Sequence, residues 1–124
     1  MKSLIFIFFA SFLFINCAEV QEENTITTIE LKELLSKDKI QLIDVRTQRE
    51  VKQGSIETAL FIDFFDKEFL MKVNRIVNKK RPVYLYCRSG NRSGKATKML
   101  LENGFEVYNV LGGYTKWKKE INKE

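Results

Sequence analysis

The sequence predicts an α/β fold with a mostly parallel sheet and helices on both of its faces. Short apolar runs alternate along the chain with longer segments in which apolar residues recur at helical spacing. This alternation is typical of parallel sheets, because a crossover between two parallel strands needs a connection about as long as a helix. The chain has 124 residues, 44% of them apolar, and no internal repeat, which indicates one domain with its own core plus terminal extensions.

The first half of the domain is predicted to begin with a helix. Thr27 and Glu30 have the spacing of a capping box, and Leu31, Leu34 and Leu35 form an apolar face on the helix that follows. The other elements of this half are a buried strand over 40–45, a short helix over 48–53 that Gly54 ends, and a short strand over 59–62.

The second half continues the alternation of helices and strands. Apolar residues at helical spacing predict a helix within 66–77, and Pro82 introduces a strand over 83–86. A helix over 91–103 follows, and Gly104 stands just after its end, where glycine commonly stops a helix. The last elements are a strand over 105–110 and a closing helix over 114–122.

A cysteine stands at the junction between the strand over 83–86 and the next helix. Cys87 opens a loop that contains Gly90, and the backbone N–H groups of such a loop converge on one point. The helix behind the loop adds positive potential, and Arg88 and Arg92 add formal charge, so the thiolate is favoured. The chain contains no histidine, which excludes a Cys–His dyad and leaves loop, helix and arginines to stabilise a nucleophilic thiolate.

The length of this loop indicates what it can hold. Four residues separate Cys87 from Arg92, whereas cysteine phosphatases have one residue more, because their loop wraps a tetrahedral phosphate. A tighter ring suits a single bound sulfur atom, as in a persulfide, better than a phosphoryl group. Tyr86 also stands where those phosphatases usually carry histidine.

Four segments in one order resemble the signature of a known family. They are Leu42-Ile43-Asp44-Val45-Arg46, then Glu50 with Gly54-Ser55-Ile56 and Ala59, then Cys87-Arg88-Ser89-Gly90-Asn91-Arg92-Ser93, and finally Val110-Leu111-Gly112-Gly113-Tyr114 with Trp117. Together they resemble the rhodanese (sulfurtransferase) domain, and the resemblance covers roughly residues 27–122. It implies a rhodanese-like three-layer fold. Two departures, Ser55 for a common histidine and Glu57-Thr58 for Pro-Gly, bear on the geometry of a turn.

The resemblance also implies a reaction and a set of site residues. Cys87 would take a sulfane sulfur from a donor such as thiosulfate and hold it as a persulfide. It would then pass the sulfur to cyanide or a thiol, and a protein could be the acceptor. No metal or organic cofactor is implied. The loop residues that would bind substrate are Arg88, Ser89, Gly90, Asn91, Arg92 and Ser93.

Several alternatives stay open at this point. The chain could be a persulfide carrier or a non-catalytic binding module, and a cysteine phosphatase is disfavoured by loop length. Arg92 could neutralise the persulfide or be a surface arginine at a helix end. Ser93 could donate to the sulfur, although capping the helix is the commoner use of such a serine. Asp44 and Arg46 could orient the loop from the neighbouring strand, but an ion pair between Arg46 and Glu50 is the favoured interpretation.

The N-terminus is predicted to be a targeting segment. After Lys2, an apolar run over 4–15 is too short to span a bilayer and fits a signal-peptide core, which gives a signal peptide over 1–16. Cys17 follows at once, so we expect a bacterial lipoprotein that is lipidated at Cys17, with a polar tether over 17–26. An ordinary cleaved signal peptide and an uncleaved anchor are the alternatives. The domain would then lie in the cell envelope, held to a membrane only by this anchor or soluble in the periplasm.

The charge of the chain is compatible with a small anionic substrate. The net charge is +5, the basic residues are spread along the chain, and no nucleic-acid-binding motif occurs. A nucleic acid is therefore not an expected partner. If Cys17 is lipidated, Cys87 is the only free thiol of an exported protein.

Overall fold

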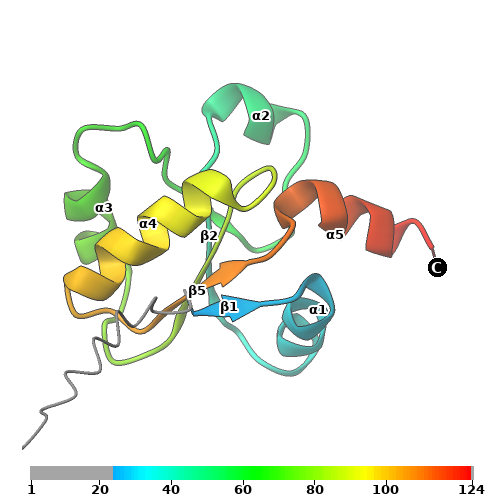
Figure 1. Ribbon diagram of the computed structural model, residues 1–124, viewed down its shortest axis with the longest axis horizontal. Helices are drawn as coiled ribbons and strands as arrows, with labels where there is room; N and C mark the ends of the chain where they lie inside the picture. Colours follow the sequence, from blue (N-terminus) through cyan, green and yellow to red (C-terminus); the bar gives the residue numbers. More distant parts are fainter. Residues whose placement is uncertain (1–23, 124) are drawn as a thin grey trace, which may run out of the picture.

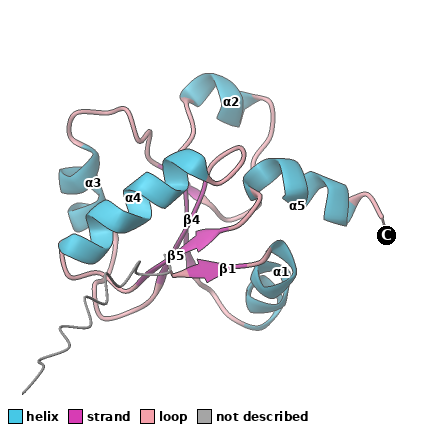
Figure 2. Ribbon diagram, in the orientation of Figure 1, coloured by secondary structure: helices cyan, strands magenta, loops and turns pink. Residues whose placement is uncertain are grey.

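A sheet of five parallel strands forms the centre of the molecule. The computed structural model describes residues 24–123. The strands follow one another across the sheet in the order β1-β5-β4-β2-β3, and every recorded pairing is parallel, which confirms the predicted sheet type (Figure 2). Their bounds are β1 Thr25–Ile26, β2 Gln41–Asp44, β3 Leu60–Phe61, β4 Val83–Tyr86 and β5 Val107–Val110.

Helices cover both faces of this sheet, as the alternation of elements predicts. Figure 1 shows α3 and α4 on one side of the sheet and α1 and α5 on the other, with α2 above the sheet edge. One buried cluster includes Val73 of α3 and Leu100 of α4, and a second includes Leu31 of α1 and Trp117 of α5. The helix bounds are α1 Thr28–Lys37, α2 Gln48–Lys52, α3 Phe69–Ile76, α4 Asn91–Glu102 and α5 Gly113–Ile121.

One strand was not predicted. Thr25 and Ile26 form β1, which pairs with β5 through Asn109 and Val110 at the edge of the sheet. The polar tether expected to continue to residue 26 therefore ends earlier, because its last two residues belong to the folded domain. A strand of two residues is too short to show periodicity in a sequence. The predicted signal peptide and Cys17 lie outside the described residues.

Capping determines where the first two helices begin. The Thr27 side chain accepts from the Glu30 backbone N–H, as the capping-box spacing predicts. A second and complete capping box opens α2, because Glu50 reaches back to the Thr47 backbone N–H. This second box fixes the direction of the Glu50 side chain, which matters for the site described below.

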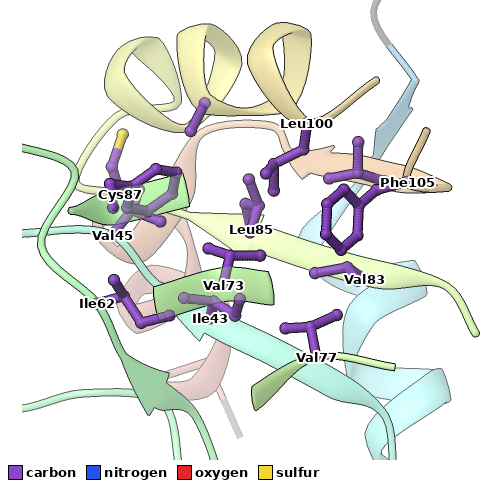
Figure 3. Packing of buried hydrophobic residues seen from close by; sticks show 13 residues of the cluster. Ile43, Val45, Ile62, Val73, Val77, Val83, Leu85, Cys87, Leu100 and Phe105 are labelled. Atoms are coloured by element: carbon purple, nitrogen blue, oxygen red, sulfur yellow. The ribbon is translucent and has the colours of Figure 1, made fainter. Parts of the chain in front are cut away.

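The cluster between the sheet and the α3 and α4 helices extends to the carboxyl ends of the strands. Figure 3 shows Cys87 beyond the end of β4, near Val45 and with α4 above it. Cys87 is only 1% exposed and belongs to this cluster together with Val45 and Ile62. The reactive group is therefore held by the core and does not lie on a free loop. Among the described residues, no helix is long and apolar enough to cross a bilayer.

The turn that departs from the family pattern has a strained backbone. Thr58 has φ +70°, the single positive value at a non-glycine position in residues 24–123, and it stands where the resemblance expects glycine. A β-branched residue in the left-handed region is sterically unfavourable by roughly 1–2 kcal/mol. The departure from Pro-Gly thus places a β-branched residue in a left-handed conformation.

Replacing Thr58 with glycine should stabilise the domain. The strain that is relieved exceeds the free-energy cost of the extra chain entropy of glycine. We therefore expect the free energy of unfolding to rise by up to about 1 kcal/mol and Tm to rise by a few degrees. Thermal unfolding followed by circular dichroism measures the change. Glu57→Gly is the matched control, because Glu57 is an exposed neighbour without positive φ, and it should be destabilising. Equal effects from both substitutions would contradict the strain argument.

Candidate active site

The loop between β4 and α4 brings backbone N–H groups to the Cys87 sulfur. The Gly90 N–H donates to Cys87 Sγ at 3.1 Å, and Gly90 has φ +103°, a left-handed conformation that glycine adopts without strain. A Cβ at Gly90 would make only ordinary contacts, so the backbone conformation is what requires glycine here. The residue acts as the N-cap of α4, which places the first turn of that helix behind the sulfur.

These contacts decide the ionisation of the thiol. Burial alone would raise the pKa of Cys87. Hydrogen bonds from the Ser93 side chain and from the backbone N–H groups of Ser93, Gly90 and Ser89 outweigh this effect and hold the pKa below its usual value. The sequence-based expectation that the loop favours a thiolate therefore has a geometric basis.

Ser93 contacts the sulfur and does not cap the helix. Its hydroxyl lies 3.3 Å from Cys87 Sγ and 2.6 Å from Asn109 Oδ1, and α4 has no side-chain cap. Asn109 Nδ2 donates to the Gly90 carbonyl at 3.1 Å, so this asparagine connects the end of the loop with Ser93 in the first turn of α4. Sequence reasoning missed Asn109, although a buried asparagine within the apolar strand β5 is a signal that could have identified it.

Removing the Ser93 hydroxyl should raise the pKa of Cys87. In Ser93→Ala one donor to the thiolate is lost, so the pH midpoint of iodoacetamide alkylation should move upward and alkylation near neutral pH should slow. Ser89→Ala is the matched control, because Ser89 contributes its backbone N–H and keeps it in the variant. A profile of Ser93→Ala that overlies the wild type would refute the proposed contact.

Arg92 is held by an acidic residue from α2. Its two terminal nitrogens donate to the two Glu50 carboxylate oxygens, each at 2.7 Å. The hydrogen bond from Arg92 is the largest cause that lowers the pKa of Glu50, to about 2, and contacts with Thr47 contribute further. The favoured ion pair between Arg46 and Glu50 is therefore wrong, because the capping box of α2 directs Glu50 toward the loop.

Arg46 pairs instead with Asp44, and both side chains are buried. Arg46 Nη2 lies 2.6 Å from Asp44 Oδ2 and also donates to the Gly54 carbonyl at 2.7 Å. The guanidinium carbon lies 4.2 Å from the ring centre of Tyr114 and 5.6 Å from that of Tyr86. Within the described contacts neither Asp44 nor Arg46 hydrogen-bonds to the loop, and Arg46 instead contacts the two tyrosines next to it.

Those tyrosines connect the buried pair to the cysteine. Tyr86 precedes Cys87 in the chain, is fully buried, and its hydroxyl accepts from the Ile56 N–H at 3.0 Å. Burial is the main cause that raises the pKa of Tyr86, so the phenol stays neutral. The Tyr114 N–H donates to the Cys87 carbonyl at 2.8 Å.

The N-terminus of α5 packs directly against the loop. Gly112 and Gly113 form the expected strand-to-helix turn, and the Thr115 N–H donates to the Arg88 carbonyl at 3.0 Å. A Cβ on Gly113 would lie 2.5 Å from the Cys87 carbonyl oxygen. The closing Gly-Gly segment thus supports the loop from outside, a role that the sequence alone did not reveal.

The remaining loop side chains are exposed. Arg88, Ser89 and Asn91 all face solvent, and the Arg88 guanidinium forms no ion pair with any other residue in 24–123. Of the predicted site residues, the structure thus gathers Gly90, Ser93 and Arg92 around Cys87. It leaves Arg88 at the rim as a loop cation without an ion pair in the described part of the chain.

The family comparison agrees with this geometry. The rhodanese-like domain family matches residues 27–120, which is most of the chain. The chain belongs to the rhodanese-like family. It is 36% identical to the Bacillus subtilis protein YqhL over 95% of this chain and 94% of that protein. It is 34% identical to the thiosulfate sulfurtransferase GlpE of Coxiella burnetii over 75% of this chain and 85% of GlpE.

Solved structures show the same fold. A rhodanese-like domain protein from Staphylococcus aureus superimposes with a TM-score of 0.69 at 37% identity, covering 76% of this chain and 90% of that chain. The protein therefore has the rhodanese-like α/β fold. In residues 24–123 of this rhodanese-like domain, no group of three or more His, Cys, Asp and Glu side chains is arranged to hold a metal ion.

Proposed function

We propose that this rhodanese-like domain is a sulfurtransferase that works through a persulfide on Cys87. The observation that carries the proposal is the set of donors around the sulfur, Gly90 N–H at 3.1 Å and the Ser93 hydroxyl at 3.3 Å. Donors aimed at one atom stabilise the thiolate before the reaction and the terminal sulfur anion after it. The relative GlpE, which is named a thiosulfate sulfurtransferase, supports the same reaction class.

The proposed reaction has two half-reactions. The Cys87 thiolate attacks the sulfane sulfur of thiosulfate, a new S–S bond forms, and the old S–S bond breaks with its electron pair leaving on sulfite. A thiol or cyanide then attacks the outer sulfur of the persulfide, and the Cys87 thiolate is released. Ping-pong kinetics are expected, because donor and acceptor use the same sulfur in turn.

A cysteine phosphatase fits the site less well. Two of the five N–H groups of the Arg92 guanidinium already donate to Glu50, whose carboxylate also compensates the charge that a phosphate dianion would need. The loop before α4 is also short, with four residues between Cys87 and Arg92. The short loop supports a ring for one sulfur atom.

Mass spectrometry tests the proposal directly. The purified domain treated with thiosulfate should gain the mass of one sulfur atom on the peptide that contains Cys87, and cyanide should remove it with formation of thiocyanate. A domain that gains no sulfur from any sulfane donor would overturn the proposal. A persulfide that forms but is not passed to small acceptors would indicate a carrier whose acceptor is a protein.

We also propose that the protein is anchored in the cell envelope by a lipid on Cys17. The support is the short apolar run that precedes this cysteine in the sequence. Metabolic labelling with a fatty acid should mark the wild type but not Cys17→Ala. An unlabelled wild type would instead favour a soluble periplasmic protein.

A further inference from the structure

The two arginines of the loop differ in how their charges are compensated. Arg92 is bound at both terminal nitrogens by the Glu50 carboxylate, and both side chains are about three-quarters shielded from solvent. Arg88 is exposed and has no ion-pair partner in the described part of the chain. The acidic partner of Arg92 comes from a different element, α2, and its position is fixed by the Thr47 cap.

Cys87, the two loop arginines and Glu50 together therefore carry no net charge when the cysteine is ionised. Glu50 cancels the charge of Arg92, and the Cys87 thiolate balances the charge of Arg88. The nearby buried pair Asp44 and Arg46 is itself neutral. A donor that approaches the thiolate meets a neutral site, so a further negative charge on the donor gains no net attraction, while its desolvation still opposes binding.

On the basis of the proposed sulfur transfer, we propose that Glu50 determines which sulfane donors this domain uses. By neutralising Arg92 it makes the site select donors with one negative charge, such as thiosulfonates and organic persulfides, over dianions such as thiosulfate. Arg88 is the loop arginine left to bind the anionic end of the donor. Glu50 is thus a specificity-determining residue that acts through Arg92 and does not contact the reacting atoms.

Two donors of nearly the same shape isolate the effect of charge. Thiosulfate carries two negative charges, whereas methanethiosulfonate carries one, because a methyl group replaces an oxygen. In both cases the Cys87 thiolate attacks the terminal sulfur and the S–S bond breaks. The electron pair leaves on sulfite from thiosulfate and on methanesulfinate from methanethiosulfonate, so the two half-reactions balance in the same way.

The test compares the two donors in wild type and Glu50→Gln. Glutamine can still accept from Thr47 and Arg92, but it frees the charge of Arg92. The KM for thiosulfate should fall about three- to tenfold, while the KM for methanethiosulfonate should change less than about twofold. The selectivity for methanethiosulfonate, as a ratio of kcat/KM values, should fall by the quotient of these two changes. The change should shrink at high salt, because screening weakens the freed charge.

Two control variants separate charge from structure. Glu102→Gln removes the same charge from the other end of α4, about 15 Å from Arg92 along the helix, and should leave the donor ratio unchanged. Thr27→Ala weakens the cap of α1, which does not contact Glu50, without changing charge, and it should also leave the ratio unchanged. Arg88→Gln should move the ratio in the opposite direction, because the dianion loses more than the monoanion.

The outcomes distinguish this inference from the proposed function. If Glu50→Gln lowers kcat for both donors equally and leaves the ratio unchanged, Glu50 is structural and the inference is wrong. If Glu50→Gln does not fold, an unchanged donor ratio in Arg88→Gln would overturn the inference on its own. Sulfur transfer itself would still stand in either case, because persulfide formation on wild-type Cys87 is measured separately. If wild type forms no persulfide from either donor, the proposed function fails first.

Discussion

Cys87→Ser should abolish sulfur transfer while the fold is retained. The serine hydroxyl is not ionised near neutral pH and cannot form a persulfide, so kcat/KM for thiosulfate should fall by at least about 1,000-fold. The substitution is nearly isosteric, and the donors that now face the sulfur, the Gly90 N–H and the Ser93 hydroxyl, can bind the smaller oxygen. Thermal unfolding should therefore change by only a few degrees.

The assay for this variant is thiocyanate formation from thiosulfate and cyanide. Cys17→Ser is the matched control, because it removes the other cysteine of the chain and should leave turnover unchanged. Turnover of Cys87→Ser above about one tenth of the wild-type rate would show that another group carries the sulfur.

Gly113→Ala should damage the fold and the site together. The added Cβ would lie 2.5 Å from the Cys87 carbonyl oxygen and 2.7 Å from that of Arg88, and both are backbone atoms that cannot rotate away. The alanine would also have to adopt φ +53°. We expect a loss of about 2–4 kcal/mol in the free energy of unfolding and a fall in Tm of more than about 10 °C.

The substitution Gly104→Ala separates the two causes. Gly104 also has positive φ, +82°, but nothing lies within 4 Å of its Cβ position. Its replacement by alanine should lower the free energy of unfolding by about 1 kcal/mol and leave sulfur transfer unchanged. Gly113→Ala should in addition displace the carbonyls that precede Gly90, so kcat should fall even well below its Tm. Equal losses in both variants would mean that the contact between α5 and the loop is unimportant.

The elements that could be predicted are those with local signals. The strand Val83–Tyr86 and the helix that starts at Asn91 have the predicted limits at the site, because Pro82 and Gly90 mark their beginnings. The Thr27 cap was predicted from its spacing alone. The position of Cys87 follows from these elements, because a residue between a parallel strand and the next helix must lie at the carboxyl edge of the sheet.

What could not be predicted depends on contacts between distant segments. The sequence favours the nearby Arg46 as the ion-pair partner of Glu50. Only the three-dimensional arrangement brings Glu50 to Arg92, 42 positions away in the chain. Arg46 pairs with Asp44 and not with Glu50, and its guanidinium lies over the ring of Tyr114 on α5. Asn109 meets Ser93 and Gly90 because β5 lies beside β4, a neighbour relation that no short pattern contains.

The parallel direction of the strands has a consequence for the lipid anchor proposed at Cys17. The described chain enters β1 from Asn24 at the amino edge of the sheet, whereas Cys87 leaves β4 at the carboxyl edge. From a lipid on Cys17, the seven residue steps to Asn24 span at most about 25 Å. Such an anchor would hold the amino edge near the bilayer surface and turn the thiol outward, toward the aqueous space. Water-soluble donors and acceptors would then reach the sulfur without approaching the lipid.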